Sequence, residues 1–490
     1  MTKLRSCKLL TLVPAGDQKT GSAGKLSGWQ RACAVFMLGV AMPIALPART
    51  FTTLHSFSGT DGANSYTGLV QGTDGSFYGT TIDGGANAGG NVFKITPSGK
   101  LTSLYSFCSQ RNCTDGQYPV TMLVQGPDGN FYGTTQSGGT NGGFGTVFRI
   151  IRRGTLTTLH SFNGTGDGAA PYGSLVLAIN GNFYGTANVG GTYGAGNVFK
   201  ITPSGKLTTL YSFCSQSGCP DGQYPVGPLI QATDGNVYGT THAGGNNSCT
   251  DGCGTVFKIT LSGKLTTLHR FDTTDGDYPY GGVVEGAKMF YGTTGGGGAD
   301  NWGTVFKMTS SGKLTTLHSF NGTDGSNAYA LSLATNGDFY GTTSTGGVDV
   351  DGRIFKITPG GTLTIMHTFD GKDGKNLYGG LVQGTNGMFY GTTYFGGANN
   401  DGTVFSLAVG LGPFVETRPT SGKMGASVII LGTNLTGASS VTFDGTPATF
   451  KVISKSEIKT TVPDGATSGT VKVTTPSRKL SSNVPFLVTK

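Results

Sequence analysis

The chain has 490 residues, among them 86 Gly, 19 Pro, 28 Phe and 19 Tyr, and only 12% of its residues are charged. The glycines follow no three-residue period, which excludes collagen, and the many aromatic residues exclude a disordered chain. The net charge is +8, but most of the excess lies in residues 1–48, and the remainder is nearly neutral. This balance excludes nucleic-acid binding driven by charge and leaves a glycine-punctuated all-β protein.

Residues 1–48 have the composition of an export signal. The basic residues of this segment are Lys3, Arg5, Lys8, Lys19, Lys25 and Arg31. An apolar run over residues 32–46 follows and ends before Pro47-Ala48. Because the run is short for a membrane-spanning helix and contains Pro43, we predict a signal peptide over residues 1–48 and an extracytoplasmic protein, secreted or held at the cell surface. An uncleaved signal is the only membrane anchor that we expect.

A repeat of about 50 residues occupies the next part of the chain. Each copy holds a short apolar run, then variants of Phe-Tyr-Gly-Thr-Thr, Val-Phe-Lys and Leu-Thr-Thr-Leu-His-Ser-Phe. The second element has its tyrosine at Tyr78, Tyr132, Tyr184, Tyr238, Tyr291, Tyr340 and Tyr390. The third begins at Val92, Val147, Val198, Val256, Val305, Ile354 and Val404, and the fourth ends at Phe57, Phe107, Phe162, Phe213, Phe271, Phe320 and Phe369.

Each element is short, rich in Thr, Val, Phe and Tyr, and bounded by Gly, Asp, Asn or Pro, which is typical of strands. Four strands in each of seven repeats predict a seven-bladed β-propeller over residues 49–408. The tight turns, such as residues 97–100, are too short to cross between blades, so the longer stretch after each Leu-His-Ser-Phe is the expected crossover. The repeats then begin with an isolated outer strand ending at Phe57 and end with a third strand at Val404. We therefore expect the N-terminal strand to complete the last blade and close the ring.

The repeat resembles the Gloeobacter/Verrucomicrobia ("GloVer") tandem repeat of exported bacterial proteins, over about residues 51–407. The resemblance implies export and a repeat architecture, and it implies no particular reaction. Members of this family often end in a surface-anchoring domain, and no sorting motif of that kind stands at the C-terminus of this sequence.

Residues 413–490 differ in composition from the repeats and show short alternating strands at 427–431, 440–443, 448–453, 457–462, 469–474 and 484–488. The pattern of Pro419, Gly422, Gly432, Phe443 and Pro463 in and around these strands resembles the IPT/TIG immunoglobulin-like family. The resemblance implies a small β-sandwich that acts as a spacer or interaction module.

Six cysteines lie in the repeats as three close pairs. We expect the disulfides Cys108–Cys113, Cys214–Cys219 and Cys249–Cys253, because the first two pairs are repeat-equivalent and the protein is exported. The alternative is a zinc site formed by the thiolates of Cys214, Cys219, Cys249 and Cys253. No metal or other cofactor is predicted.

The crossover loops carry the candidate binding residues. Their aspartates, each followed by Gly, are Asp61, Asp115, Asp167, Asp221, Asp275, Asp324 and Asp373. The candidate aromatic and imidazole groups are Tyr118, Tyr172, Tyr224, Tyr278 and His242. The aspartates either cap their own turns or, with the aromatic groups, bind a ligand, either a glycan or Ca²⁺, although their spacing matches no EF-hand loop. Loops at one end of a rigid scaffold are where function concentrates. The histidines of the fourth strands lie on different blades, so we expect them to pack between blades.

No pattern typical of a nucleophile, phosphate-binding or paired-carboxylate site stands out, so we predict a non-catalytic extracytoplasmic binding protein. Its expected partner is an extracellular glycan or a surface protein, and no nucleic acid. Two alternatives remain at this point: a propeller-type polysaccharide lyase or hydrolase that uses His242, and a purely structural surface component.

Overall fold

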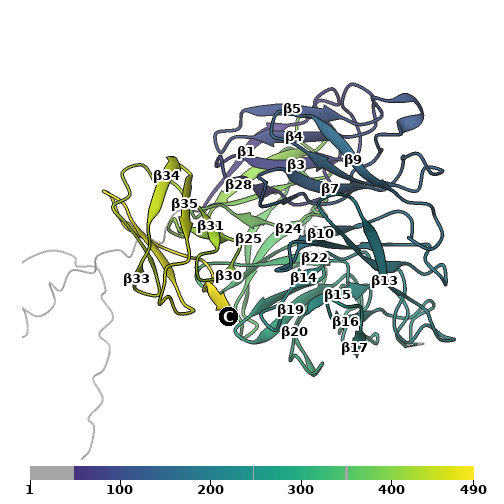
Figure 1. Cartoon of the computed structure of the whole chain (residues 1–490). Helices are drawn as coiled ribbons and strands as arrows, with labels where there is room; N and C mark the ends of the chain where they lie inside the picture. The colour runs from purple at the N-terminus through teal and green to yellow at the C-terminus, as the bar shows by residue number, and fades with distance from the viewer. Residues whose placement is uncertain (1–48, 247, 348–350, 490) are drawn as a thin grey trace, which may run out of the picture. The chain divides into compact units, whose positions relative to one another are not determined.

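The computed structural model describes residues 49–246, 248–347 and 351–489, so the predicted signal peptide at 1–48 lies outside the described residues. These residues form an all-β structure of short strands, with a single 3₁₀ turn η1 (Arg111–Cys113) and no α-helix in the described part of the chain (Figure 1). The predicted all-β class is confirmed.

Seven four-stranded antiparallel sheets make up the described repeat region (Figure 1). The first is β2 (Val70–Gln71), β3 (Phe77–Thr81), β4 (Asn91–Ile95) and β5 (Leu101–Ser106). The second is β6 (Val124–Gln125), β7 (Phe131–Thr135), β8 (Thr146–Ile150) and β9 (Leu156–Ser161). The third is β10 (Gly173–Leu177), β11 (Phe183–Ala187), β12 (Asn197–Ile201) and β13 (Leu207–Ser212). The fourth is β14 (Ile230–Gln231), β15 (Val237–Thr241), β16 (Thr255–Ile259) and β17 (Leu265–Arg270).

The fifth sheet is β18 (Val283–Gly286), β19 (Met289–Thr294), β20 (Thr304–Met308) and β21 (Leu314–Ser319). The sixth is β22 (Ser326–Leu333), β23 (Phe339–Thr345), β24 (Arg353–Ile357) and β25 (Leu363–Thr368). The seventh is β26 (Val382–Gln383), β27 (Phe389–Thr392), β28 (Thr403–Ala408) and β1 (Thr50–Ser56). The strand order within each sheet is the one that the loop lengths predict, and β1 pairs antiparallel with β28.

The Phe-Tyr-Gly-Thr-Thr strand is second in its sheet and is buried along its whole length. Its glycine has no room for a side chain, since a Cβ on Gly79 would lie 2.7 Å from the ring of Phe93 in the next strand. Its tyrosine packs on the following sheet: the rings of Tyr78 and Phe131 lie 4.0 Å apart. The same contact joins the seventh sheet to the first, where the rings of Tyr390 and Phe77 lie 3.9 Å apart.

The C-terminal region holds the remaining strands. They are β29 (Glu416–Arg418), β30 (Ser421–Lys423), β31 (Ser427–Leu431), β32 (Ser440–Phe443), β33 (Thr446–Pro447), β34 (Phe450–Ser454), β35 (Glu457–Thr461), β36 (Val471–Thr474), β37 (Lys479–Ser481) and β38 (Leu487–Thr489). One sheet has the order β29-β31-β35-β34, the other β33-β32-β36-β37, and β30 pairs with β38. A shared core that includes Val428, Ile430, Ile458 and Val471 lies between them, as in a β-sandwich.

Candidate functional site

The connections of each repeat sheet lie at two opposite ends because its strands are antiparallel. We call the end with the crossover loops and the loops between second and third strands the loop face. The other end, with the tight turns between first and second and between third and fourth strands, is the turn face. Loops long enough to shape a binding site lie on the loop face.

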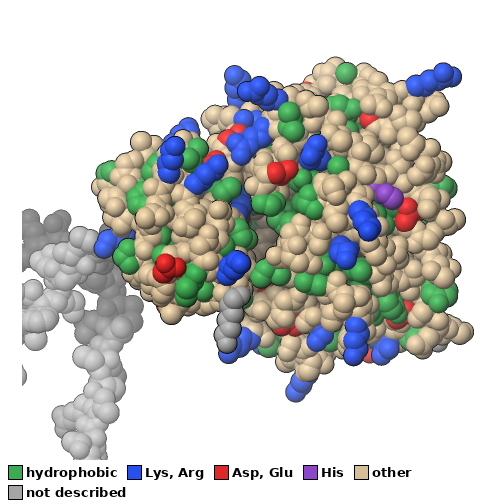
Figure 2. Space-filling view, in the orientation of Figure 1, with side chains coloured by type: hydrophobic (Ala, Val, Ile, Leu, Met, Phe, Trp, Pro, Cys, Tyr) green, Lys and Arg blue, Asp and Glu red, His purple; other side chains and the backbone are tan. Residues whose placement is uncertain are grey.

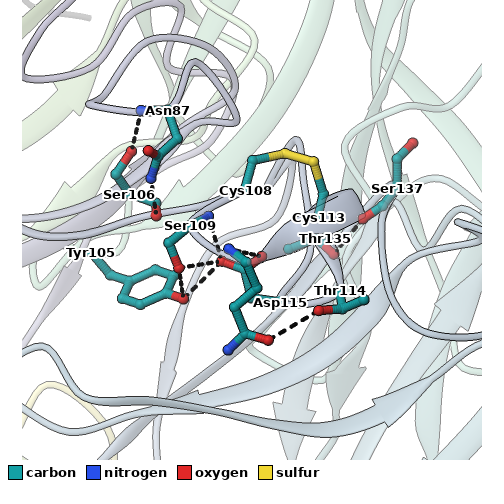
Figure 3. The surroundings of a disulfide bond; sticks show 11 residues. Asn87, Tyr105, Ser106, Cys108, Ser109, Cys113, Thr114, Asp115, Thr135 and Ser137 are labelled. Carbon is teal, nitrogen blue, oxygen red and sulfur yellow. Dashed lines mark hydrogen bonds between the residues drawn. A yellow bond between two sulfur atoms is a disulfide. The ribbon is translucent and has the colours of Figure 1, made fainter.

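Each crossover aspartate binds within its own loop. Its partner is the His or Tyr near the end of the preceding fourth strand, as in the 2.8 Å contact between His55 Nε2 and Asp61 Oδ2. Figure 3 shows the version with a tyrosine, where the Tyr105 and Ser109 hydroxyls and the Ser109 backbone N–H donate to Asp115. The equivalent pairs are His160–Asp167, Tyr211–Asp221, His269–Asp275, His318–Asp324 and His367–Asp373. The aspartates thus stabilise the start of each crossover loop through local hydrogen bonds. They lie in seven separate loops and do not form one cluster.

The three predicted cysteine pairs are disulfides: Cys108–Cys113, Cys214–Cys219 and Cys249–Cys253 (Figure 3 for the first). Bonded cysteines have no thiolate to offer a metal, so the four-thiolate zinc alternative is wrong. Among the described residues, no group of three or more His, Cys, Asp and Glu side chains is arranged to hold a metal ion.

A cluster of tyrosines gathers where the crossover loops enter the first strands. At one equivalent position of the seven repeats stand Tyr66, Val120, Tyr172, Val226, Tyr280, Tyr329 and Tyr378. Two residues before this position every repeat has a residue with left-handed φ, such as Asn64 (φ 59°) or Ala170 (φ 48°). We call the five tyrosines among them the tyrosine cluster.

The rings of the tyrosine cluster are in mutual contact. Tyr280 stacks on Tyr329 with centroids 5.1 Å apart, and Tyr66 stacks on Tyr378 at 4.9 Å. Tyr66 also meets Tyr172 and Tyr329 edge to face, at 6.3 and 6.4 Å. Side chains from five different repeats are thus packed into one aromatic layer.

Burial controls the protonation of these groups. It raises the pKa of Tyr66 to about 12, while a hydrogen bond with Tyr329 acts in the opposite direction. Burial also raises the pKa values of Tyr172, Tyr280 and Tyr378, with nearby ionisable groups adding to the effect at Tyr280. The cluster is therefore neutral at physiological pH, and its hydroxyls keep their protons for hydrogen bonding.

A cavity of about 490 Å³ lies on the loop side of this layer. Its lining residues are Tyr66, Tyr172, Asn188, Val189, Tyr224, Val226, His242 and Tyr280. The ring of His242 stacks on Tyr278 with centroids 4.7 Å apart and lies tilted against Tyr280 at 4.9 Å. Burial lowers the pKa of His242, so its imidazole is neutral at physiological pH. Asn188 Oδ1 and His242 Nδ1 are buried and have no hydrogen-bond partner among the described residues.

A second cavity of about 420 Å³ lies between the first strands of the sheets. Tyr66, Tyr172 and Tyr280 line it as well, so the tyrosine cluster separates the two cavities. Aliphatic side chains such as Leu69, Ile230 and Val382 form its walls, and Glu416 and Arg418 of β29 also line it. Arg418 donates hydrogen bonds to Glu416 and to Gln125 of β6.

The sequence analysis named part of this site. Tyr172, Tyr224 and His242 line the loop-face cavity, and Tyr278 stacks on His242. Tyr118 has the same left-handed φ as Tyr224 and Tyr278, but it is not among the residues that line the cavity. The residues that the sequence analysis missed are Tyr66, Tyr280, Tyr329 and Tyr378. A signal for them exists, since each stands directly before a Thr, Gly or Ala at equivalent positions of the repeats.

No helix in the described part of the chain is both long and apolar enough to cross a membrane. Comparison with curated protein sequences gives no significant match.

Solved structures give distant matches. Extracellular domains assigned to two hybrid two-component systems of B. thetaiotaomicron match with TM-scores of 0.49 at 12% and 13% identity. The alignments cover 78% and 88% of this chain, but only 45% and 57% of those chains. A fungal alcohol oxidase of the AA5 family, solved with copper, has a TM-score of 0.49 at 11% identity, over 90% of this chain and 99% of its own. At these identities and scores the matches assign no activity to the chain.

Family comparison covers most of the sequence. The Gloeobacter/Verrucomicrobia repeat matches residues 14–251 and 246–439, and the IPT/TIG domain matches residues 415–488. Both resemblances found in the sequence are confirmed. The chain belongs to the Gloeobacter/Verrucomicrobia repeat family and carries a C-terminal IPT/TIG domain.

Proposed function

We propose that the protein is an extracytoplasmic binding protein that takes a neutral sugar chain into the loop-face cavity. The observation that carries this proposal is the lining of that cavity. Flat tyrosine faces stack well on the apolar faces of sugar rings, and the unpartnered Asn188 Oδ1 and His242 Nδ1 can accept hydrogen bonds from sugar hydroxyls.

The charge of the loop face favours a neutral ligand over an anionic one. In addition to the seven crossover aspartates, this face carries Asp83, Asp251, Asp272, Asp277, Asp300, Asp370 and Asp401. The basic residues there are fewer: Arg111, Arg270, Arg353, Lys372 and Lys375. A polyanion approaching the cavity would meet repulsion from most of its surroundings.

The disulfide bonds of the protein favour export from the cytosol. Three disulfides persist in an oxidising compartment and are rare in the cytosol. The basic and then apolar segment within residues 1–48 would act as the export signal, followed by the repeat domain at 49–408 and the IPT/TIG domain at 413–490.

The scaffold of the site would be a closed propeller of seven blades. The pairing of β1 with β28 and the contact of Tyr390 with Phe77 both support closure, because each joins the end of the repeat region to its beginning. Closure would hold the tyrosine cluster rigid, since its five rings come from five repeats.

The experiment is binding of the purified full chain to an array of neutral and charged glycans. We expect at least one neutral glycan to bind, and Tyr66→Ala with Tyr280→Ala to weaken it about tenfold or more. The matched control is Lys206→Ala with Lys264→Ala on the turn face, which should leave binding unchanged. Equal loss in both variants, or no loss in either, overturns the assignment. Cleavage of the bound glycan that stops in His242→Ala would instead support the enzyme alternative.

A further inference from the structure

Two lysines of the IPT/TIG domain are placed directly opposite each other. Lys451 of β34 pairs in register with Lys459 of β35, and both side chains are exposed. Like charges at directly opposed positions of neighbouring strands destabilise a sheet. In the described structure neither lysine has an ion-pair partner, so this surface carries an uncompensated positive charge.

The pair lies in a groove of about 550 Å³ between the IPT/TIG domain and the turn face. From the repeat region, Pro127 in the turn between β6 and β7 of the second sheet also lines the groove. On the same face of the sheet as the two lysines, the residues of the groove are Ser427, Ile429, Thr449 and Thr461, whereas Val428 and Phe450 face the core of the sandwich. This face of the groove combines cations with hydroxyl groups and one aliphatic side chain.

Further cations lie where the turn between β34 and β35 meets the repeat region. Arg152, in a turn of the second sheet, donates a hydrogen bond to the Thr73 hydroxyl, and Ser456 donates to the Thr73 carbonyl oxygen at 2.9 Å. The exposed residues Arg153 and Lys455 are the chain neighbours of Arg152 and Ser456, so they also lie close to this junction.

Several carboxylates lie near these cations. Asp74 forms an ion pair with Lys94 at 2.7 Å, whereas Asp128 accepts hydrogen bonds only from the neutral Asn130 and Tyr132 and keeps its charge. Glu457 and the exposed Asp464 are close in sequence to the groove residues Lys459 and Thr461. Against the three carboxylates other than Asp74 stand the basic residues Arg152, Arg153, Lys451, Lys455 and Lys459, so positive charge is in excess.

The positive surface continues along the turn face. The turns between third and fourth strands of successive sheets carry exposed basic residues: Lys100, Arg153, Lys206, Lys264 and Lys313. Each turn is held close to the preceding sheet, as shown by Gly99, whose Cβ would lie 2.6 Å from the Leu54 carbonyl oxygen. Figure 2 shows Lys and Arg side chains over the IPT/TIG domain and the neighbouring repeat surface, with few Asp or Glu among them.

The geometry points to a second binding site here, for an anionic polysaccharide that lies in the groove and extends over the turn face. Carboxylate or sulfate groups would neutralise Lys451 and Lys459, and hydroxyls of the sugar would meet Thr449 and Thr461. A flexible polysaccharide chain can follow the hollow beside the two lysines more closely than a flat lipid bilayer can. This site is separate from the loop-face cavity and does not depend on it.

The test is fluorescence anisotropy of labelled oligogalacturonate, a carboxylated polysaccharide, with the purified full chain at low ionic strength. We expect binding that weakens as salt is added, because salt screens these exposed charges. Lys451→Gln with Lys459→Gln should weaken binding about tenfold or more. The matched control is Lys472→Gln with Lys479→Gln, which removes the same charge from exposed positions on the other sheet of the same domain.

Equal loss of binding in both double variants would mean that only net charge matters and would overturn the site. The absence of oligogalacturonate binding would overturn it too. Tighter binding to vesicles of anionic phospholipid or to double-stranded DNA than to oligogalacturonate would overturn the choice of ligand. Binding of a neutral glycan in the loop-face cavity should be unchanged in Lys451→Gln with Lys459→Gln, so failure of one site is distinguishable from failure of the other.

Discussion

The imidazole of His242 lies against the ring of Tyr280, with centroids 4.9 Å apart. This contact removes the imidazole from water, and the lowered pKa of His242 is the consequence. A protonated His242 would carry a charge into the aromatic layer.

The pH dependence of stability should report this burial. The folded-state pKa of His242 is below the value of about 6.5 for an unfolded chain, so the unfolded state binds the proton first as pH falls. The wild type should therefore lose stability relative to His242→Gln below about pH 6.5, whereas the difference should be constant above it. Chemical unfolding of both proteins between neutral and acidic pH measures this. A difference that does not change with pH would contradict the assigned burial.

The disulfide Cys108–Cys113 closes a short loop, with a sequence separation of 5. Replacing both cysteines by Ser should lower the free energy of unfolding by about 2 kcal/mol on the chain-entropy account. Peptide mapping without reduction should recover the three pairs, and denaturant unfolding gives the energy. Unpaired thiols or exchanged partners would show the pairing to be wrong.

Neighbouring glycines in the turn between β24 and β25 should respond differently to alanine. Gly361 has φ +97°, and a Cβ there would lie 2.8 Å from the Leu317 carbonyl oxygen. Gly360 has an ordinary φ, and the nearest atom to its Cβ would be 3.8 Å away. Gly361→Ala should destabilise the protein by about 1–3 kcal/mol, while Gly360→Ala should be neutral or slightly stabilising. Thermal unfolding of the pair checks this, and equal effects would contradict it.

The N-terminal strand should be needed for a stable repeat domain. Deleting residues 49–58 removes β1, exposes the edge of β28 and takes away Phe51, whose ring lies 3.8 Å from His367 and 5.2 Å from Phe405. The free energy of unfolding should fall by several kcal/mol. A synthetic peptide of residues 49–58 should restore part of the loss when added in excess. A deletion variant that melts within a degree or two of the intact protein would show that β1 contributes little.

Repetition made the scaffold predictable. Seven copies of the same four elements define strand order and turn positions. Because the last repeat lacks a fourth strand, the isolated strand at Phe51–Phe57 was predicted to pair with its third strand, as β1 does with β28. The IPT/TIG strands at 427–431 and 440–443 were also predicted at their observed bounds, and the four other predicted strands differ by a few residues at their ends. The short strands β29, β30, β33 and β37 were not predicted.

The candidate site was less predictable because it depends on the register of the crossover loops. Tyr118, Tyr224 and Tyr278 precede a proline, whereas Tyr172 follows one, and the sequence analysis grouped all four. The left-handed φ of Tyr224 and Tyr278 turns the chain there, so the residue two positions later occupies the cluster site, as Tyr280 does. The groove beside Lys451 and Lys459 was not predicted for a different reason. It forms between segments that are far apart in sequence, and no local sequence pattern predicts it.

The pairing of β1 with β28 also has a consequence for synthesis. The ribosome makes Thr50–Ser56 long before Thr403–Ala408, and at about 5–20 residues per second the two are separated by roughly tens of seconds. During that interval the early strand has no partner, and a chain that stops before its last repeat never obtains one. Only a chain synthesised through residue 408 can supply the strand that pairs with β1. Chains whose synthesis stops earlier would keep an unpaired β1 strand, which chaperones and proteases can recognise.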